Sequence, residues 1–315
     1  MVKYLLKRLG LMIITLFVIV SATFFLMNSM PGNPVRSQAK KLPESVLKNM
    51  EQKYGLDKPV GERYVMYLEN IVKGDLGDSF VTPGLSVGEI IKDGFPASAK
   101  IGIQSVLFGL VIGVLLGIIA GFKRNTPVDY AVMFIAILGV AIPSFVLATL
   151  IQSILGGNFG IPIAGWYSSK TPFFEQFKFV ILPTIALSFG SIATYARYMR
   201  ASVLDVLGQD YILTAKAKGL SSGAITCKHI LRNSILPIIT ILGPQIATII
   251  TGTVVIEKIF AIPGIGNALV DAIYSKDYNV IMGLTLFFSA LYILSILIVD
   301  ILYSVIDPRI KLEGK

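Results

Sequence analysis

The chain offers few side chains of the kinds that perform enzyme chemistry. Its one cysteine, Cys227, and one histidine, His229, stand two residues apart in a segment that we expect to be helical. Residues at i and i+2 do not share a helical face, so no nucleophile–base pair is expected there. A single cysteine excludes a disulfide framework and zinc sites built on several thiolates. No cluster of His, Asp, Glu or Ser lies near the end of an apolar segment, so the sequence predicts no catalytic residue and no metal site.

A loop for binding nucleotide phosphates is also missing from the sequence. Such a loop has the pattern Gly-x-x-x-x-Gly-Lys-Ser/Thr, in which backbone amides cradle the phosphates. The pattern does not occur in the chain. We therefore expect no ATP hydrolysis and no bound cofactor in this chain, and any ATP-driven role requires a partner protein.

Neutral polar side chains recur inside the apolar segments. They could offer hydrogen bonds to a polar molecule that crosses an apolar layer. The alternative is helix–helix packing, in which Ser and Thr are favoured. The candidates for such a pathway are Ser144, Ser188, Ser191, Gln245, Thr248 and Thr251.

The elements that must position these side chains are long apolar stretches. The chain has 315 residues, of which 54% are hydrophobic and 15% charged, whereas a soluble domain carries about 25% charged residues. An ordinary water-soluble enzyme is therefore excluded. A membrane-spanning helix needs about 20 mostly apolar residues. Six stretches satisfy this length or approach it, and they cover residues 9–35, 101–122, 130–155, 179–196, 233–256 and 278–299.

The fold class predicted from these stretches is an all-α polytopic membrane protein with six transmembrane helices. The fourth stretch is the shortest, and Pro183 near its start suits the first turn of a helix. The first stretch could instead be a secretory signal, but apolar regions of signals have about 7–15 residues. We therefore expect it to remain as a span.

The distribution of charge predicts the orientation of the spans. With six spans, both termini lie on one side, together with residues 123–129 and 197–232. That side carries 14 basic and six acidic residues, and the other side carries 14 basic and 13 acidic residues. Because short cytoplasmic loops carry an excess of Lys and Arg, we predict that both termini are cytoplasmic.

Two segments on the external side are expected to have structure of their own. Residues 30–100 have mixed charge and turn signals, and 43–54 and 62–72 have the pattern of short amphipathic helices. This segment is predicted to be a small external domain between the first two spans. Residues 257–277 mix apolar and turn residues and are expected to pack against the spans. Asp277 at the end of this stretch is expected to be solvated at the surface.

The loop between the fourth and fifth spans is the longest on the cytoplasmic side. Asp210 can cap a short helix that runs to Lys218, and Gly219 suits the position just after its end. A second helix starts near Ser221 or Ser222 and runs toward Pro237. The sequence thus predicts a short helix between two longer ones.

This short helix has two possible roles. It could lie at the membrane surface, with its lysines on lipid phosphates. It could instead be a docking element for a cytoplasmic protein, because the small side chains of Ala215 and Ala217 would let another surface approach closely. The residues of this candidate docking helix are Asp210, Tyr211, Thr214, Ala215, Lys216, Ala217, Lys218, Gly219 and Leu220.

The same loop resembles the cytoplasmic "EAA" loop of ABC importer permeases. The resemblance lies in Thr-Ala-Lys-Ala-Lys-Gly-Leu at 214–220 and Arg-Asn-Ser-Ile-Leu-Pro at 232–237, although the glutamate that gives the loop its name is absent. Other strings resemble the peptide/nickel family of these permeases, most closely the first permease subunit of oligopeptide transporters. They are Pro-Gly-Asn-Pro at 31–34, Tyr-Gly-Leu-Asp-Lys-Pro at 54–59, Gly-Asp-Leu-Gly at 74–77, Ile-Glu-Lys-Ile-Phe at 256–260 and Asp-Pro-Arg-Ile at 307–310.

The resemblance implies a type I ABC importer fold with four parts. Residues 1–29 would be the cytoplasmic N-terminus and first span, 30–100 the external domain, 101–305 the importer core, and 306–315 a cytoplasmic tail. It also implies a pore-forming subunit, not an enzyme, in a prokaryotic cell membrane. This subunit would import oligopeptides, with dipeptides or nickel as alternatives within the family.

The implied partners are a similar second permease, two ABC ATPase subunits that bind ATP and Mg²⁺, an external peptide-binding protein and membrane lipid, with no nucleic acid. Residues 210–219 would form the coupling helix on an ATPase. An ion-coupled secondary transporter is an alternative of a different class, but it would be expected to carry intramembrane ionisable residues, and almost none occur here. A membrane enzyme or a receptor that uses residues 30–100 is a further alternative.

Overall fold

A computed structural model describes residues 2–30, 44–53 and 55–306, and this part of the chain is built from helices. Two compact units are present. Unit 1 contains the described residues up to Ser98 together with Pro263–Leu294, and unit 2 contains Ala99–Ile262 and the described residues from Ser295 onward. The sequence-based boundary between the external segment and the core, at residues 100 and 101, falls inside one continuous helix.

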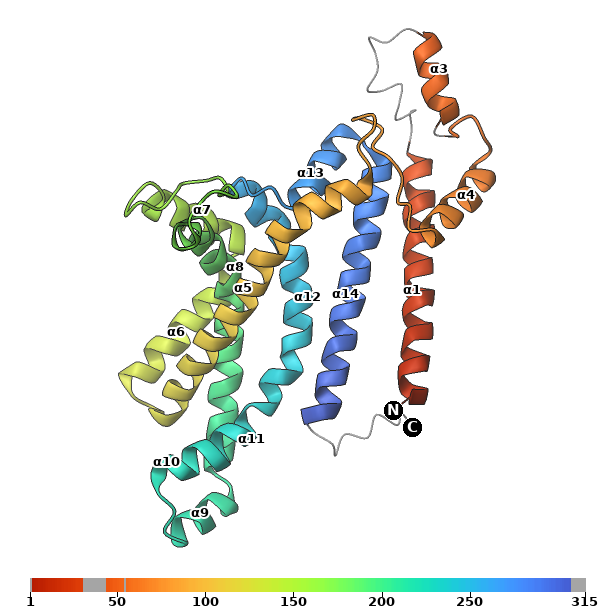
Figure 1. The fold of residues 1–315 in the computed structure, drawn as a ribbon. Coiled ribbons are helices and arrows are strands. Elements are labelled where there is room, and N and C mark those ends of the chain that lie inside the picture. The colour runs from red at the N-terminus through yellow and green to blue at the C-terminus, as the bar shows by residue number, and fades with distance from the viewer. Residues whose placement is uncertain (1, 31–43, 54, 307–315) are drawn as a thin grey trace. The chain divides into compact units, whose positions relative to one another are not determined.

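The described residues of unit 1 form two small hydrophobic clusters. One joins Phe24 and Met27 to Phe80, Tyr278 and Met282. The helices of this unit are α1 (Val2–Ser29), α3 (Glu44–Lys53), α4 (Val60–Val72), the first turns of α5 (Val87–Phe122), α13 (Ile265–Ser275) and the first part of α14 (Tyr278–Ile306) (Figure 1). The prediction that the stretch before residue 277 is packed is confirmed, because Ile265 is buried and its N–H donates to Ser98 Oγ over 3.0 Å.

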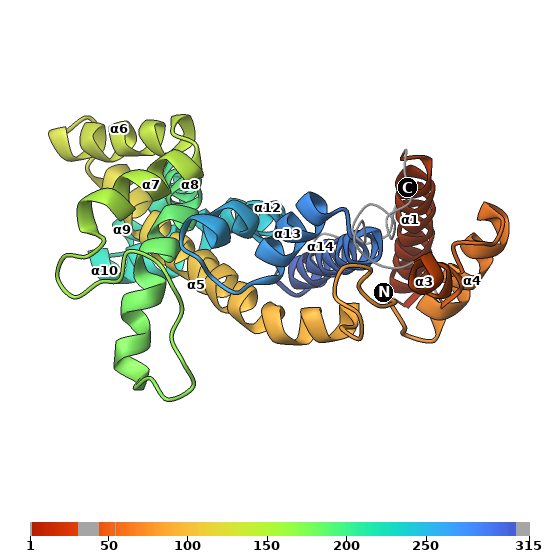
Figure 2. The ribbon, with the colours of Figure 1, turned by 90° about the horizontal axis from the view of Figure 1, so that it is seen from above.

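Unit 2 is arranged around α8 (Phe173–Leu207), which contributes more of its buried residues than any other helix. Helices α6 (Pro127–Ala141), α7 (Ser144–Leu155) and α12 (Leu236–Ile259) pack against α8 (Figures 1 and 2). The remaining elements are the rest of α5, α9 (Asp210–Ala217), α10 (Ser222–Ile225), the π-helix η1 (Thr226–Leu231), α11 (Arg232–Ser234) and the end of α14.

A row of glycines on α5 lets this helix approach α8 closely. Gly109, Gly113, Gly117 and Gly121 recur every four residues and so share one helical face. A Cβ atom at Gly117 would lie 2.6 Å from the carbonyl oxygen of Ala196, and the other three would meet α8 side chains at 2.7–3.0 Å. Small residues at this spacing are typical of tightly packed membrane helices. At these four glycines the backbone of α5 therefore lies directly against α8, and there is no room for larger side chains.

An ion pair ties α6 to α8. Arg200 Nε and Nη2 donate to the two carboxylate oxygens of Asp129 over 2.5 and 2.6 Å. Asp129 is buried and also accepts the N–H of Asn125 over 3.0 Å. Two parallel bonds of this kind fix orientation as well as distance, so the turn between α5 and α6 is held on α8.

The predicted membrane class agrees with the helices. Among the described residues, five helices are long and apolar enough to cross a membrane, and the bent pair of α6 and α7 would make a sixth span. The prediction of one helix over 130–155 is wrong, because the chain bends by 110° between α6 and α7. The bend is at Ile142, which is extended as is typical of a residue before proline, and Pro143 then precedes α7.

The fourth predicted span is longer than the apolar stretch indicated. Helix α8 begins at Phe173, directly after Pro172, and Pro183 lies in its interior. The expectation that Pro183 occupies the first turn is therefore wrong. Burial explains the difference: α8 continues through polar residues to Leu207 because much of its surface is covered by neighbouring helices.

Candidate functional site

Helix α9 is mounted on unit 2 through one buried face. Ile212 is fully buried and Ala215 nearly so. They join a cluster with Val203 and Val206 of α8 and with Ile225 of α10. Ala215 was expected to let a partner approach closely; this is wrong, because its methyl group packs inside the chain. Each Å² of apolar surface that is buried contributes about 25 cal/mol, and this stabilises the attachment of α9.

Both ends of α9 are closed by local structure. The residue before the first turn is Gln209, and Asp210 is the first helical residue, so Asp210 does not cap the helix as predicted. At the other end, Gly219 N–H donates to Lys216 O over 3.0 Å and Leu220 N–H to Ala215 O over 3.3 Å. This is a Schellman motif, and Gly219 has the positive φ of 73° that the motif requires. The predicted role of Gly219 is thus confirmed.

The segment after α9 returns to the core as a continuous helical run. Ser221 Oγ accepts the N–H of Ala224 over 3.3 Å and caps α10. The π-helix η1 and α11 follow, and the fully buried Ser234 donates to Ser202 O of α8 over 3.4 Å. Asn233 Nδ2 donates to the hydroxyl of Tyr211 over 3.1 Å, which ties this run to α9. Helix α9 is therefore held from both sides.

The opposite face of α9 is open. The most exposed large apolar side chain on it is Leu213, at 62%. We did not single out Leu213 from the sequence, although its position next to the buried Ile212 places it on the other side of the helix. Of the predicted docking residues, all except Ala215 are exposed: Asp210, Tyr211, Thr214, Lys216, Ala217, Lys218, Gly219 and Leu220.

The structure brings together only part of the predicted polar pathway. Ser191 Oγ donates to Gln245 Oε1 over 3.4 Å and so links α8 to α12. Ser188 and Ser191 are buried, and a Cβ atom at Gly109 would meet both at 3.0–3.5 Å. Both serines therefore lie in the tight contact between α5 and α8.

The other predicted pathway residues lie apart from this pair. Ser144 is exposed at the first position of α7, after the bend. Thr248 and Thr251 belong to α12, and their side chains are outside the described part of the chain. A role of these residues in a pathway remains a prediction.

Asp277 in unit 1 is a site that sequence reasoning placed wrongly. It was expected at the solvated surface, but its side chain is 3% exposed. Its carboxylate accepts Ser79 Oγ–H, Phe80 N–H at 3.1 Å and Val81 N–H at 3.4 Å. Residue 277 and the loop 78–82 are about 200 residues apart in the sequence, so no local pattern indicated the contact.

Two known protein families match the chain, each over a different range of residues. Residues 113–312 match the family described as binding-protein-dependent transport system inner membrane component. Residues 1–101 match the N-terminal domain of membrane components of the same transport systems.

Several curated proteins are similar over their whole length. The dipeptide transport system permease protein DppB of Bacillus subtilis is 44% identical over 100% of both chains. The oligopeptide transport system permease protein OppB of Haemophilus influenzae is 41% identical over 99% of this chain and 100% of its own.

A solved structure shows the same fold. A chain of the MetNI methionine ABC transporter, described as inward facing, superposes with a TM-score of 0.57 at 18% identity, covering 69% of this chain and 96% of its own. The expected type I ABC importer fold is thus confirmed. The matched family models and the full-length relatives place this chain in the family of binding-protein-dependent transport system inner membrane components.

Proposed function

We propose that the chain is the permease subunit of an ATP-driven importer of peptides in a prokaryotic cell membrane. The support is the full-length similarity to permeases named for dipeptides and oligopeptides. Oligopeptides are the substrate we put first, and dipeptides are the alternative within the same chemistry. Peptides are polar molecules, so they need a route that shields their amides from the hydrocarbon core.

The proposed assembly contains a second homologous permease and two ABC ATPase subunits. An external or periplasmic peptide-binding protein delivers the substrate, and both termini of this chain face the cytoplasm. The observation that carries the coupling proposal is α9: Ile212 fixes one face in the core, while Leu213 and Lys216 are presented on the outside. When an ATPase moves such a helix, the displacement is transmitted to α8 and α12, because both contribute residues to the hydrophobic cluster that contains Ile212.

The proposed pathway uses Gln245, Thr248 and Thr251 of α12. These residues recur every three positions, which predicts one polar helical face. Gln245 already accepts a hydrogen bond from Ser191. Ser144 and Ser188 are assigned to the same pathway with less support from their positions, since Ser188 is buried in a helix contact.

Docking on α9 can be tested by replacing Leu213 with glutamate. We expect the ATPase subunits to co-purify poorly with Leu213→Glu and peptide-dependent ATP hydrolysis to fall at least about tenfold, because an apolar side chain at the centre of an interface commonly contributes this much. The matched control is Ile163→Glu in the loop between α7 and α8, since Ile163 is 57% exposed and lies on no part of α9.

Normal co-purification of the ATPases with Leu213→Glu would contradict the docking assignment. Import of peptide by the purified chain in liposomes without any ATPase would contradict the whole proposal and favour an ion-coupled transporter. Loss of coupling in Leu213→Glu alone, with Ile163→Glu unchanged, is the result we expect.

A further inference from the structure

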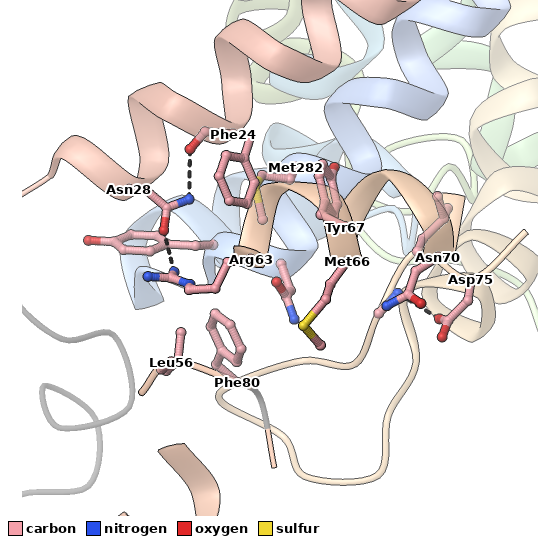
Figure 3. Close-up of a pocket in the computed structure, with 14 residues that line it drawn as sticks. Phe24, Asn28, Leu56, Arg63, Met66, Tyr67, Asn70, Asp75, Phe80 and Met282 are labelled. Atoms are coloured by element: carbon pink, nitrogen blue, oxygen red, sulfur yellow. Dashed lines mark hydrogen bonds between the residues drawn. The ribbon is translucent and has the colours of Figure 1, made fainter. Parts of the chain in front are cut away.

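Unit 1 contains a pocket that the proposed function does not use. It has a volume of about 110 Å³ and lies between α1, α4, the loop before α5 and the start of α14 (Figure 3). All of its walls belong to unit 1. None of its lining residues belongs to α8, α9 or α12.

The walls of the pocket are aromatic rings and thioethers. Phe24 packs against Tyr67 with ring centroids 5.4 Å apart, and Phe80 and Tyr278 join the same cluster. Met66 and Met282 contribute sulfur atoms, which adapt to apolar groups of different shape. Phe24, Phe80 and Tyr278 are buried, so this wall favours an apolar occupant. Burial also raises the pKa of Tyr67 to about 12.

One end of the pocket carries a positive charge. Arg63 Nη2 donates to Asn28 Oδ1, and Asn28 Nδ2 donates in turn to Phe24 O over 2.8 Å (Figure 3). Partial burial lowers the pKa of Arg63. Within the described residues no carboxylate lies at salt-bridge distance from this guanidinium. A guanidinium held in a fixed orientation with donors to spare is suited to a carboxylate, which it can bind through two parallel hydrogen bonds.

The other end of the pocket carries a negative charge. Asp75 Oδ1 accepts the N–H of Gly77 over 2.8 Å, and the N–H of Asp75 donates to Asn70 O over 2.9 Å. Figure 3 shows Asn70 and Asp75 at the end away from Arg63. From one end to the other, the pocket therefore offers a cation, an apolar wall and a hydrogen-bond acceptor.

We propose that this pocket binds the C-terminal residue of a short peptide through its free carboxylate and its apolar side chain. The carboxylate lies on Arg63, and the side chain lies against the rings of Phe24 and Phe80. A cavity of about 150 Å³ admits a benzene ring, so the observed volume suits one residue and not a whole peptide. The choice of a peptide rests on the proposed function, whereas the preference for a carboxylate rests on the pocket alone.

The test measures binding of L-alanyl-L-leucine to the purified full chain in nanodiscs of neutral lipid. We expect saturable binding that weakens about tenfold or more when the peptide carries a C-terminal amide, because a charge-assisted hydrogen bond is lost. This comparison uses the unchanged protein and does not depend on the folding of any variant. Equal binding of the acid and the amide would overturn the proposal.

Variants then locate the site. Arg63→Gln is expected to remove the preference for the acid over the amide, and Arg63→Lys to retain part of it. The matched control is Lys170→Gln, which removes an exposed positive charge from unit 2 and should leave binding unchanged. A preference that survives Arg63→Gln would overturn the assignment to this pocket.

Two further outcomes separate the alternatives. If anionic lipid in the nanodiscs competes with the peptide in the wild type but not in Arg63→Gln, the pocket is a site for lipid phosphate and the proposal is wrong. If the complete assembly imports L-alanyl-L-leucine but this chain does not bind its carboxylate, the pocket assignment fails and the proposed function stands. A complete assembly that imports no peptide would instead contradict the proposed function.

Discussion

Helix α9 in unit 2 and the loop 78–82 in unit 1 are both short connecting segments, and different forces hold them in place. The contact of α9 with the core is apolar: Ile212 and Ala215 enter a hydrophobic cluster, and the helix ends are closed by backbone hydrogen bonds. The loop 78–82 also places Phe80 in a hydrophobic cluster, but its contacts are largely polar. The Asp277 carboxylate accepts a hydroxyl and two backbone N–H groups, and Asn279 Nδ2 donates to Asp78 O over 3.0 Å.

This difference determines how far each segment can move from its position. Hydrophobic contact is not directional, so α9 can shift without leaving a buried polar group unpaired. Its hydrogen bond from Asn233 to Tyr211 is exposed, and water can replace it. The loop 78–82 has little such freedom, because moving it away from Asp277 would take this acceptor from the buried Ser79 hydroxyl and Phe80 N–H. We therefore expect α9 to transmit motion and the loop to keep a fixed shape.

The largest expected effect comes from Asp277→Ala. It removes the Asp277 acceptor of the buried Ser79 hydroxyl and of the buried Phe80 N–H, whereas Val81 N–H still donates to Ser79 Oγ over 3.2 Å. The loss of a buried hydrogen-bond partner costs roughly 1–3 kcal/mol per group. We expect unit 1 to lose about 3 kcal/mol or more of stability, seen as a lower Tm and faster hydrogen exchange in the loop 78–82.

The matched control for this change is Asp93→Ala, since Asp93 is an exposed carboxylate of the same unit. It should change Tm little, because surface substitutions usually stay within about 0.5 kcal/mol. If both variants lose the same stability, the polar anchoring of the loop is disproved.

The next effect tests the apolar mounting of α9. Ile212→Ala removes a fully buried side chain, and such changes commonly cost about 2–5 kcal/mol. We expect α9 to exchange its amide hydrogens faster while unit 1 is unaffected. Leu213→Ala is the control. The Leu213 side chain is next to Ile212 in the sequence but is exposed, so its loss should leave hydrogen exchange in α9 nearly unchanged.

The two segments also differ in how well the sequence predicted them. Apart from the cap assigned to Asp210, the short helix that begins there, its end before Gly219 and a second helix after Ser221 were predicted correctly, because each depends on residues within a few positions. The burial of Ala215 was not foreseen, because helix spacing alone does not say which face meets the core. The burial of Asp277 was not foreseen either, because its donors lie in a distant part of the sequence.

The membrane spans also show that local sequence patterns predict elements but not their tertiary contacts. Their number and approximate places follow from local hydropathy, and the fold class was predicted correctly. Pro143 marks a place where a helix can kink, but an apolar stretch does not give the size of the bend, so the break into two helices at 110° was not foreseen. The glycines from Gly109 to Gly121 are visible in the sequence, but their partner on α8 depends on tertiary packing.

A smaller effect is expected at the end of α9. Gly219 has a φ of 73° and no atom near its missing Cβ, so Gly219→Ala meets backbone strain alone, of about 1–2 kcal/mol. We expect faster exchange at Leu220 and in the last turn of α9. The matched control is Gly223→Ala, which also has open space but lies within α10 at an ordinary φ. It should not loosen α9, since alanine favours a helix over glycine; equal loosening by both variants would disprove the strain argument.

The smallest effect is expected at the start of the returning helix. Ser221→Ala removes the oxygen that accepts the N–H of Ala224, and the loss of an N-cap costs about 0.5–2 kcal/mol. The 3.3 Å length of this bond favours the lower end of that range. Ser222→Ala is the control, because Ser222 is already inside α10 and its hydroxyl caps nothing there. Faster exchange at Ala224 in Ser221→Ala alone would show that backbone capping contributes to the mounting of α9, whereas identical exchange in both variants would leave the buried face of Ile212 as its dominant anchor.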